Sequence, residues 1–110
     1  MENILDLSEE KSKVDRIVER WPVSQFMQKA NVFYKGQVPN VCFLLVSGSA
    51  EIKKNRTVTK VEGPYLIGYE DLINQNPSKV CVTLNQGAEA CIIDRSSIIY
   101  KNEVEEILSN

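Results

Sequence analysis

The feature that most constrains the fold is a series of short strand-like segments that recur along the middle of the chain. The clearest is the apolar run from Val41 to Val46, which has the length of a strand and the continuous hydrophobicity of one buried on both faces. Residues 50–53 and 57–61 instead alternate apolar and polar side chains, as half-buried strands do. About eight such strands, spaced at roughly ten residues and joined by glycine-containing turns, predict a β-sandwich or barrel.

Helical patterns are confined to the two ends of the chain, which predicts a mainly β jelly-roll barrel with flanking helices. Near the N-terminus, Ser8 can cap an amphipathic helix whose apolar stripe ends at Trp21. Ser24 can cap a second, shorter helix over residues 25–30. A C-terminal helix is predicted from a stripe of apolar residues, which consists of Ile98, Ile99, Val104, Ile107 and Leu108.

With 110 residues the chain can bury one modest core, so we expect a single domain. We divide it into an N-terminal segment and amphipathic helix at 1–23, a β-barrel at 24–97 and a C-terminal helix at 98–110. A net charge of -2 gives no field that would attract nucleic acid. The chain lacks an apolar run of membrane-spanning length and a secretory leader, which predicts a cytoplasmic protein without membrane insertion.

The sequence contains no histidine, which removes the usual metal ligand, the commonest general base and the usual activator of a nucleophilic serine or cysteine. We therefore expect no enzymatic activity, no metal site and no cofactor. The three cysteines, Cys42, Cys81 and Cys91, form no Cys-x-x-Cys pair. We expect them to be reduced thiols buried in strands.

The stretch from Gly63 to Val80 lies between strand-like segments but does not follow strand alternation. Gly63 and Gly68 allow the backbone to turn and another group to approach closely. Residues 70–73 suit one short helical turn, and the polar cluster at 74–77 ends it.

Four landmarks, in order, resemble the cyclic-nucleotide-binding domain. They are the turn at 34–37, the hairpin at 43–52, the Ile67-Gly68 pair with Leu72-Ile73 after it, and the last strand with its helical exit at 90–98. The resemblance covers about residues 24–108 and implies that 63–80 is the phosphate-binding cassette of a sensor domain. The ligand-binding positions that the resemblance implies are Gly68, Tyr69, Glu70, Ser78 and Lys79.

Two of these positions depart from the family pattern. The family has a glutamate after the cassette glycine, which holds the ribose, and an arginine after the cassette proline, which binds the cyclic phosphate; here Tyr69 and Ser78 follow Gly68 and Pro77. A serine hydroxyl cannot replace the bidentate guanidinium. Glu70 and Lys79 stand one position later and could supply both charges if the loop shifted, although a one-residue slip sends a strand side chain to the opposite face.

The main hypothesis is therefore a regulatory or signalling module that has lost the phosphate- and ribose-binding side chains and acts through protein–protein contact, with a partner or with itself. The contact residues would be Trp21 together with Ile99, Val104, Ile107 and Leu108, although the Trp21 stripe also suits the domain's own core. The alternative is a working sensor of cAMP, cGMP or another small molecule with a rearranged pocket. The sequence leaves open the partner, the oligomeric state, and whether the chain is complete or the N-terminal piece of a longer protein.

Overall fold

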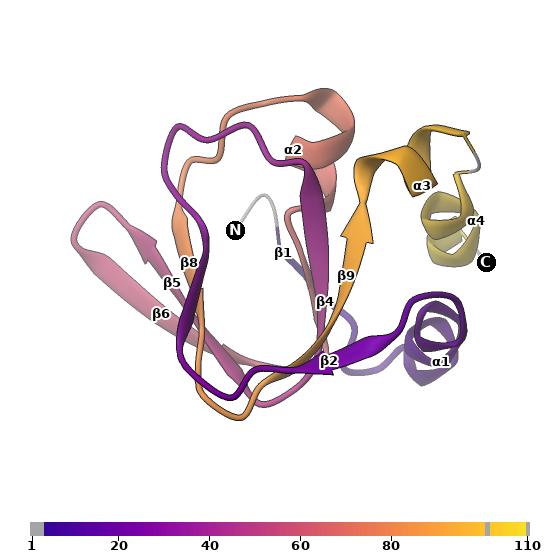
Figure 1. Cartoon of the computed structure of the whole chain (residues 1–110), viewed down its shortest axis with the longest axis horizontal. Helices are drawn as coiled ribbons and strands as arrows, with labels where there is room; N and C mark the ends of the chain where they lie inside the picture. The colour runs from indigo at the N-terminus through magenta and orange to yellow at the C-terminus, as the bar shows by residue number, and fades with distance from the viewer. Residues whose placement is uncertain (1–3, 101, 110) are drawn as a thin grey trace.

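A computed structural model describes residues 4–100 and 102–109, with the side chains at 99 and 100 outside that description. Within these residues, nine strands form two antiparallel sheets that face each other, and three of the helices pack on the outer face of one sheet (Figure 1). The five-stranded sheet has the order β1-β7-β4-β9-β2, with β1 Ile4–Asp6, β7 Tyr65–Ile67, β4 Val41–Ser47, β9 Glu89–Asp94 and β2 Val23–Gln25. The four-stranded sheet has the order β3-β8-β5-β6, with β3 Ala30–Phe33, β8 Cys81–Leu84, β5 Ser49–Lys54 and β6 Thr57–Glu62. The predicted jelly-roll class with flanking helices is confirmed.

Strand β4 lies at the centre of the five-stranded sheet and is buried on both faces, as its continuous apolar sequence predicts. Cys42 and Leu44 face the core that lies under the helices. Phe43 and Leu45 alternate with them and face the core between the two sheets. One strand therefore joins the two halves of the hydrophobic interior.

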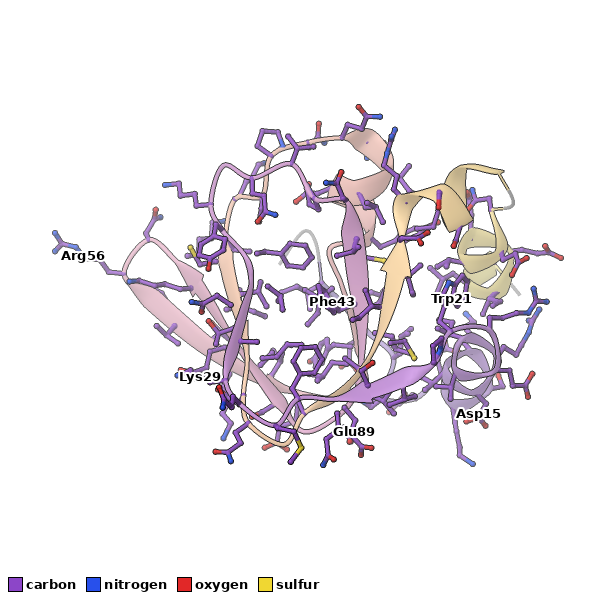
Figure 2. All side chains as sticks on the ribbon, in the orientation of Figure 1. Asp15, Trp21, Lys29, Phe43, Arg56 and Glu89 are labelled. Atoms are coloured by element: carbon purple, nitrogen blue, oxygen red, sulfur yellow. The ribbon has the colours of Figure 1, made fainter. Side chains whose placement is uncertain are left out.

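Aromatic rings fill the space between the sheets. The rings of Phe33 and Phe43 meet edge to face with centroids 5.6 Å apart, and Phe26 packs on Phe43 at 6.5 Å. Phe43 points from β4 into this space (Figure 2). The barrel interior at this level is an apolar core, not an open cavity.

Four helices are found in the described residues: α1 Lys11–Arg20, α2 Tyr69–Asn74, α3 Arg95–Tyr100 and α4 Glu103–Ser109. The first lies beside α4, where the Lys13 ammonium donates to the carbonyl of Leu108 over 3.0 Å and Arg20 forms an ion pair with Glu103. Together with α3 they cover the outer face of the five-stranded sheet (Figure 1).

Two predictions about helices in the N-terminal part of the chain are wrong. Residues 25–30 form no helix, because β2 pairs with β9 and the Phe26 amide continues that pairing by donating to the Ala88 carbonyl at 2.8 Å. Ser8 does not cap α1; its own amide donates to the carboxylate of Asp6, and the helix begins two residues after Glu9.

The C-terminal segment also differs from the single predicted helix, because it contains two helices, each with its own cap. The carboxylate of Asp94 accepts the amide of Ser97 at 2.9 Å at the start of α3. At the start of α4, the side-chain oxygen of Asn102 accepts a hydrogen bond from the backbone amide of Glu105 at 3.3 Å. The side-chain amide of Asn102 in turn donates to the carboxylate of Glu105.

All three cysteines lie in strands, as expected, and are free thiols. Burial raises the pKa of Cys42 to about 12 and raises that of Cys91, whereas Cys81 in β8 is only half-buried. Because the thiolate is the reactive form, we expect alkylation of the native protein at pH 8 to modify Cys81 first. Mass mapping after iodoacetamide treatment checks this, and early modification of Cys42 would contradict the buried position of β4.

Candidate functional site

The cassette stretch contains a tight connection between β7 and α2. Gly68 makes this connection with a φ of +91°, and its carbonyl accepts the amide of Leu72 at 3.0 Å in the first turn of α2. A Cβ atom at Gly68 would lie 2.6 Å from Cζ of Phe33, so the Phe33 ring rests directly against the glycine. The position requires glycine for both its backbone angle and its space.

Ser78 stands where the family has its phosphate-binding arginine, and it is almost completely buried at 3% exposure. Its hydroxyl donates to the carbonyl of Val80 at 2.7 Å and accepts the Val80 amide at 3.3 Å. Its own amide donates to the Gln37 carbonyl at 2.7 Å, and its carbonyl accepts the Gly36 amide at 2.8 Å. The residue therefore fixes the cassette exit to the turn after β3.

Tyr69 stands where the family has its ribose-binding glutamate, and its side chain packs against the core under the helices. The hydroxyl donates to the side-chain oxygen of Asn102 at 3.3 Å, at the start of α4. Burial, followed by the negative charge of Glu105, raises the pKa of Tyr69 to about 12. The side chain connects the cassette helix to the C-terminal helix.

A second connection lies at the other end of α2. Gln75 ends the helix in the left-handed conformation, with a φ of 55°, and its side-chain amide faces the guanidinium of Arg95 in α3. The backbone amide of Arg95 donates to the Asn40 carbonyl at 3.0 Å, just before β4. Both C-terminal helices are thus in contact with the cassette through named side chains.

A cavity of about 580 Å³ lies between the cassette and the ends of strands β3 and β5. It brings together Glu70, Ser78 and Lys79 of the predicted site, whereas Gly68 and Tyr69 do not line it. Lys35, from the turn after β3, and Lys54, from the end of β5, complete its charged lining along with Asp71. Such a mixed lining can bind a small polar molecule through both its acidic and its basic groups.

Sequence reasoning did not find Lys35 and Lys54. Neither belongs to the cassette motif, and each reads as an ordinary exposed lysine at a turn. Their approach to the cassette depends on how the two sheets pack. Their position at strand ends is the only local signal of a role in the site, and it does not distinguish them from other exposed lysines.

The proposed contact residues lie under the helices. Val104 and Ile107 are buried and Leu108 is half-buried, so they become available to a partner only if α4 leaves the sheet. Trp21 lies beside α1 and is half-buried (Figure 2). Its backbone carbonyl accepts a hydrogen bond from the Cys91 thiol at 3.3 Å. The side chain of Ile99 lies outside the described residues.

Comparison with known proteins places this arrangement in one structural class. No protein-family model matches the sequence, and no curated protein matches it. The fold is nevertheless similar to that of solved cyclic-nucleotide-binding domains. The cassette stretch at 63–80 contains β7 and α2 and lies between β6 and β8.

Three solved structures illustrate the similarity. The Thermus thermophilus catabolite activator protein is 15% identical, with a TM-score of 0.67 over 93% of this chain and 53% of its own. The regulatory domain of Toxoplasma gondii PKA, crystallised with cAMP, is 19% identical, with a TM-score of 0.66 over 94% of this chain and 43% of its own. The N-terminal domain of a Streptomyces coelicolor transcriptional regulator is 12% identical, with a TM-score of 0.66 over 92% of this chain and 79% of its own. This chain thus spans about half the length of the first two.

The described residues contain no cluster of histidine, cysteine, aspartate or glutamate suited to a metal ion. Within the same residues, no helix is long and apolar enough to cross a membrane.

Proposed function

We propose that this chain is a cytoplasmic, non-catalytic regulatory module with the cyclic-nucleotide-binding fold, in which side chains of the protein itself, and not a bound nucleotide, hold the cassette against the C-terminal helices. The observation that carries this proposal is the hydrogen bond from the Tyr69 hydroxyl to Asn102. It joins α2 to the start of α4 through two side chains of this chain.

The two positions on which nucleotide recognition depends in the resembled family support this proposal. Ser78 lines the cavity, but its buried hydroxyl is already bonded to the carbonyl and the amide of Val80 and so is engaged within the chain. The side chain of Tyr69 is directed toward Asn102 and does not line the cavity. Each missing charge-assisted hydrogen bond removes about 1.5–3 kcal/mol of binding free energy, so the loss of both anchors weakens nucleotide binding by a factor of hundreds or more.

A module held in one state presents a constant surface. The Lys13–Leu108 hydrogen bond and the Arg20–Glu103 ion pair hold α1 beside α4, and the Tyr69–Asn102 bond holds α4 on the cassette. A ligand shifts an equilibrium only by its differential affinity for the two states. A module of this kind regulates through the protein that binds its helical face, with Trp21 as a half-buried anchor.

Titration calorimetry with cAMP and with cGMP tests the proposal. We expect no binding heat and no shift in melting temperature with ligand up to about millimolar concentration, because neither anchor of the nucleotide is present. A dissociation constant in the micromolar range for either nucleotide would overturn the proposal.

The cavity favours a second candidate function, the sensing of another small polar molecule. Its lining combines the ammonium groups of Lys35, Lys54 and Lys79 with the carboxylates of Glu70 and Asp71. A thermal-shift screen of small charged metabolites tests this function. Lys54→Ala should abolish a genuine shift, whereas Lys53→Ala, one residue away on β5 and outside the cavity lining, should leave it unchanged.

A further inference from the structure

The outer edge of the four-stranded sheet is a regular strand with one open side. Among the described strands β6 pairs only with β5, and their register is uninterrupted from Ser49 opposite Glu62 to Lys54 opposite Thr57. The hairpin extends away from the rest of the molecule (Figure 1), with Arg56 at its tip (Figure 2). Five of the six residues of β6 are exposed. An open edge of this kind is a template for another strand.

The hydrogen-bond pattern identifies which backbone groups face the open side. Hydrogen-bonded and non-hydrogen-bonded pairs alternate along an antiparallel ladder. The Gly63 amide donates to the Gly48 carbonyl at 3.0 Å, so the next pair, Ser49 with Glu62, is of the non-hydrogen-bonded kind. By the same alternation, the pairs that Lys60 and Val58 form with β5 are also non-hydrogen-bonded. The N–H and C=O groups of Val58, Lys60 and Glu62 therefore point outward.

We propose that β6 pairs antiparallel with β6 of a second copy of this chain, so that Lys60 of each copy lies opposite Glu62 of the other. Val61 then faces Val61 of the second copy across the two-fold axis. The outward N–H and C=O groups of Lys60 and Glu62 form the hydrogen bonds between the two strands. The result is a continuous eight-stranded sheet, the two four-stranded sheets joined edge to edge.

Charge complementarity selects a second copy as the occupant of this edge. Lys60 and Glu62 are two residues apart, so their side chains lie on the same face of the strand. Neither forms a salt bridge with another described residue. A Lys-x-Glu pattern is self-complementary in an antiparallel pair and forms two symmetry-related ion pairs, as an isologous interface requires. The register centred on Lys60 would instead place two ammonium groups opposite each other.

The edge carries one feature that can block strand addition, the charge of Lys60, but lacks the others. β6 contains no proline, its ladder with β5 has no bulge, and its sequence is rich in β-branched residues, Thr57, Val58, Thr59 and Val61. Its only charged side chains are the two that pair in the proposed register. This inference does not depend on the cassette or on the proposed function.

Sedimentation velocity of the full chain over a concentration series tests the proposal. The wild-type protein should form a concentration-dependent dimer. Glu62→Lys and Lys60→Glu each create two like-charged pairs, and each should raise the dimer dissociation constant at least about tenfold. The double variant Lys60→Glu/Glu62→Lys should restore the wild-type constant. An equimolar mixture of the two single variants should form a heterodimer, because every pair is again of opposite charge.

A matched control is Lys53→Glu, which reverses one exposed charge on the neighbouring strand β5 and should leave the dimer constant unchanged. Urea unfolding of each variant at monomeric concentration verifies that the fold is intact. A wild-type protein that stays monomeric up to about millimolar concentration would overturn the proposal, since that range covers even weak association. A dimer that is insensitive to all the charge reversals would overturn it as well, because another surface would then hold the two copies together.

Discussion

The Gly68→Ala variant should lose about 2–4 kcal/mol of unfolding free energy. Two costs add at this position. The φ of +91° strains any residue that has a Cβ atom, by about 1–2 kcal/mol. The new Cβ atom would also lie 2.6 Å from Cζ of Phe33, a ring that is held by Phe43 and cannot withdraw cheaply.

Gly87→Ala separates these two costs. Gly87 has nearly the same backbone angle, with a φ of +89°, but a Cβ atom there would meet nothing within 4 Å. This control should lose only about 1 kcal/mol, the strain cost reduced by the lower entropy of the unfolded chain. Urea unfolding of both variants measures the difference. Equal losses would mean that Phe33 does not rest on Gly68, and the packing of the cassette on the barrel would need revision.

The fold could be predicted because its strands carry local signals. The unbroken apolar run in β4 reflects burial on both faces, and the alternation in β5 reflects a sheet with one buried face. The segment at 25–30 was predicted wrongly because most of its residues favour a helix, yet a segment of this length is too short to form a stable helix by itself. Its pairing with β9 is a long-range interaction that no local pattern records.

The site could be predicted only in part, for a similar reason. The absence of the arginine and the glutamate is visible directly in the sequence at Ser78 and Tyr69. That Ser78 is buried and bonded to the turn at 36–37 depends on two loops separated by about forty residues meeting in space, which sequence patterns do not encode. The direction of Tyr69, toward α4 and away from the cavity, likewise depends on contacts with a segment about thirty residues later in the chain.

The surroundings of Tyr69 and Ser78 also determine what would happen if the glutamate and the arginine of the family motif were restored. The double variant Tyr69→Glu/Ser78→Arg reproduces the family pattern on paper, and a working pocket would be expected to regain nucleotide affinity. At Ser78, however, the guanidinium would enter a site that is 3% exposed and would displace the Val80 hydrogen bonds. Restored binding therefore requires the loop at 76–80 to move outward, so calorimetry of the double variant reports on loop freedom as well as on the motif.

The Tyr69→Glu variant should lose about 2–4 kcal/mol of unfolding free energy at neutral pH, and Tyr69→Phe only about 0.5–1.5 kcal/mol. The phenylalanine variant keeps the ring in the core and loses one hydrogen bond, to Asn102. The glutamate variant also loses the ring and introduces a negative charge where Glu105 already acts on the tyrosine. Both variants lose the hydrogen bond. The difference between their unfolding free energies therefore measures the introduced charge and the lost packing of the ring.

The pH dependence of the glutamate variant gives the sharper test. Partial burial and the charge of Glu105 should raise the pKa of the introduced carboxyl above its ordinary value of about 4.3. A carboxyl with a raised folded-state pKa destabilises the protein when ionised, so the deficit of Tyr69→Glu against Tyr69→Phe should be largest at pH 7 and shrink as the pH falls toward about 4. Urea unfolding at several pH values measures this deficit.

Hydrogen exchange then locates the effect. If Tyr69 holds α4 on the cassette, the amides of Ile107 and Leu108, which lie beyond the first turn of α4, should exchange faster in Tyr69→Glu than the amides of β4, because α4 opens before the barrel unfolds. The same two amides should be nearly as protected in Tyr69→Phe as in the wild type. Uniform loss of protection across α4 and β4 would instead assign Tyr69 to the stability of the whole core, and the cassette would then have no separate connection to the C-terminal helix through this side chain.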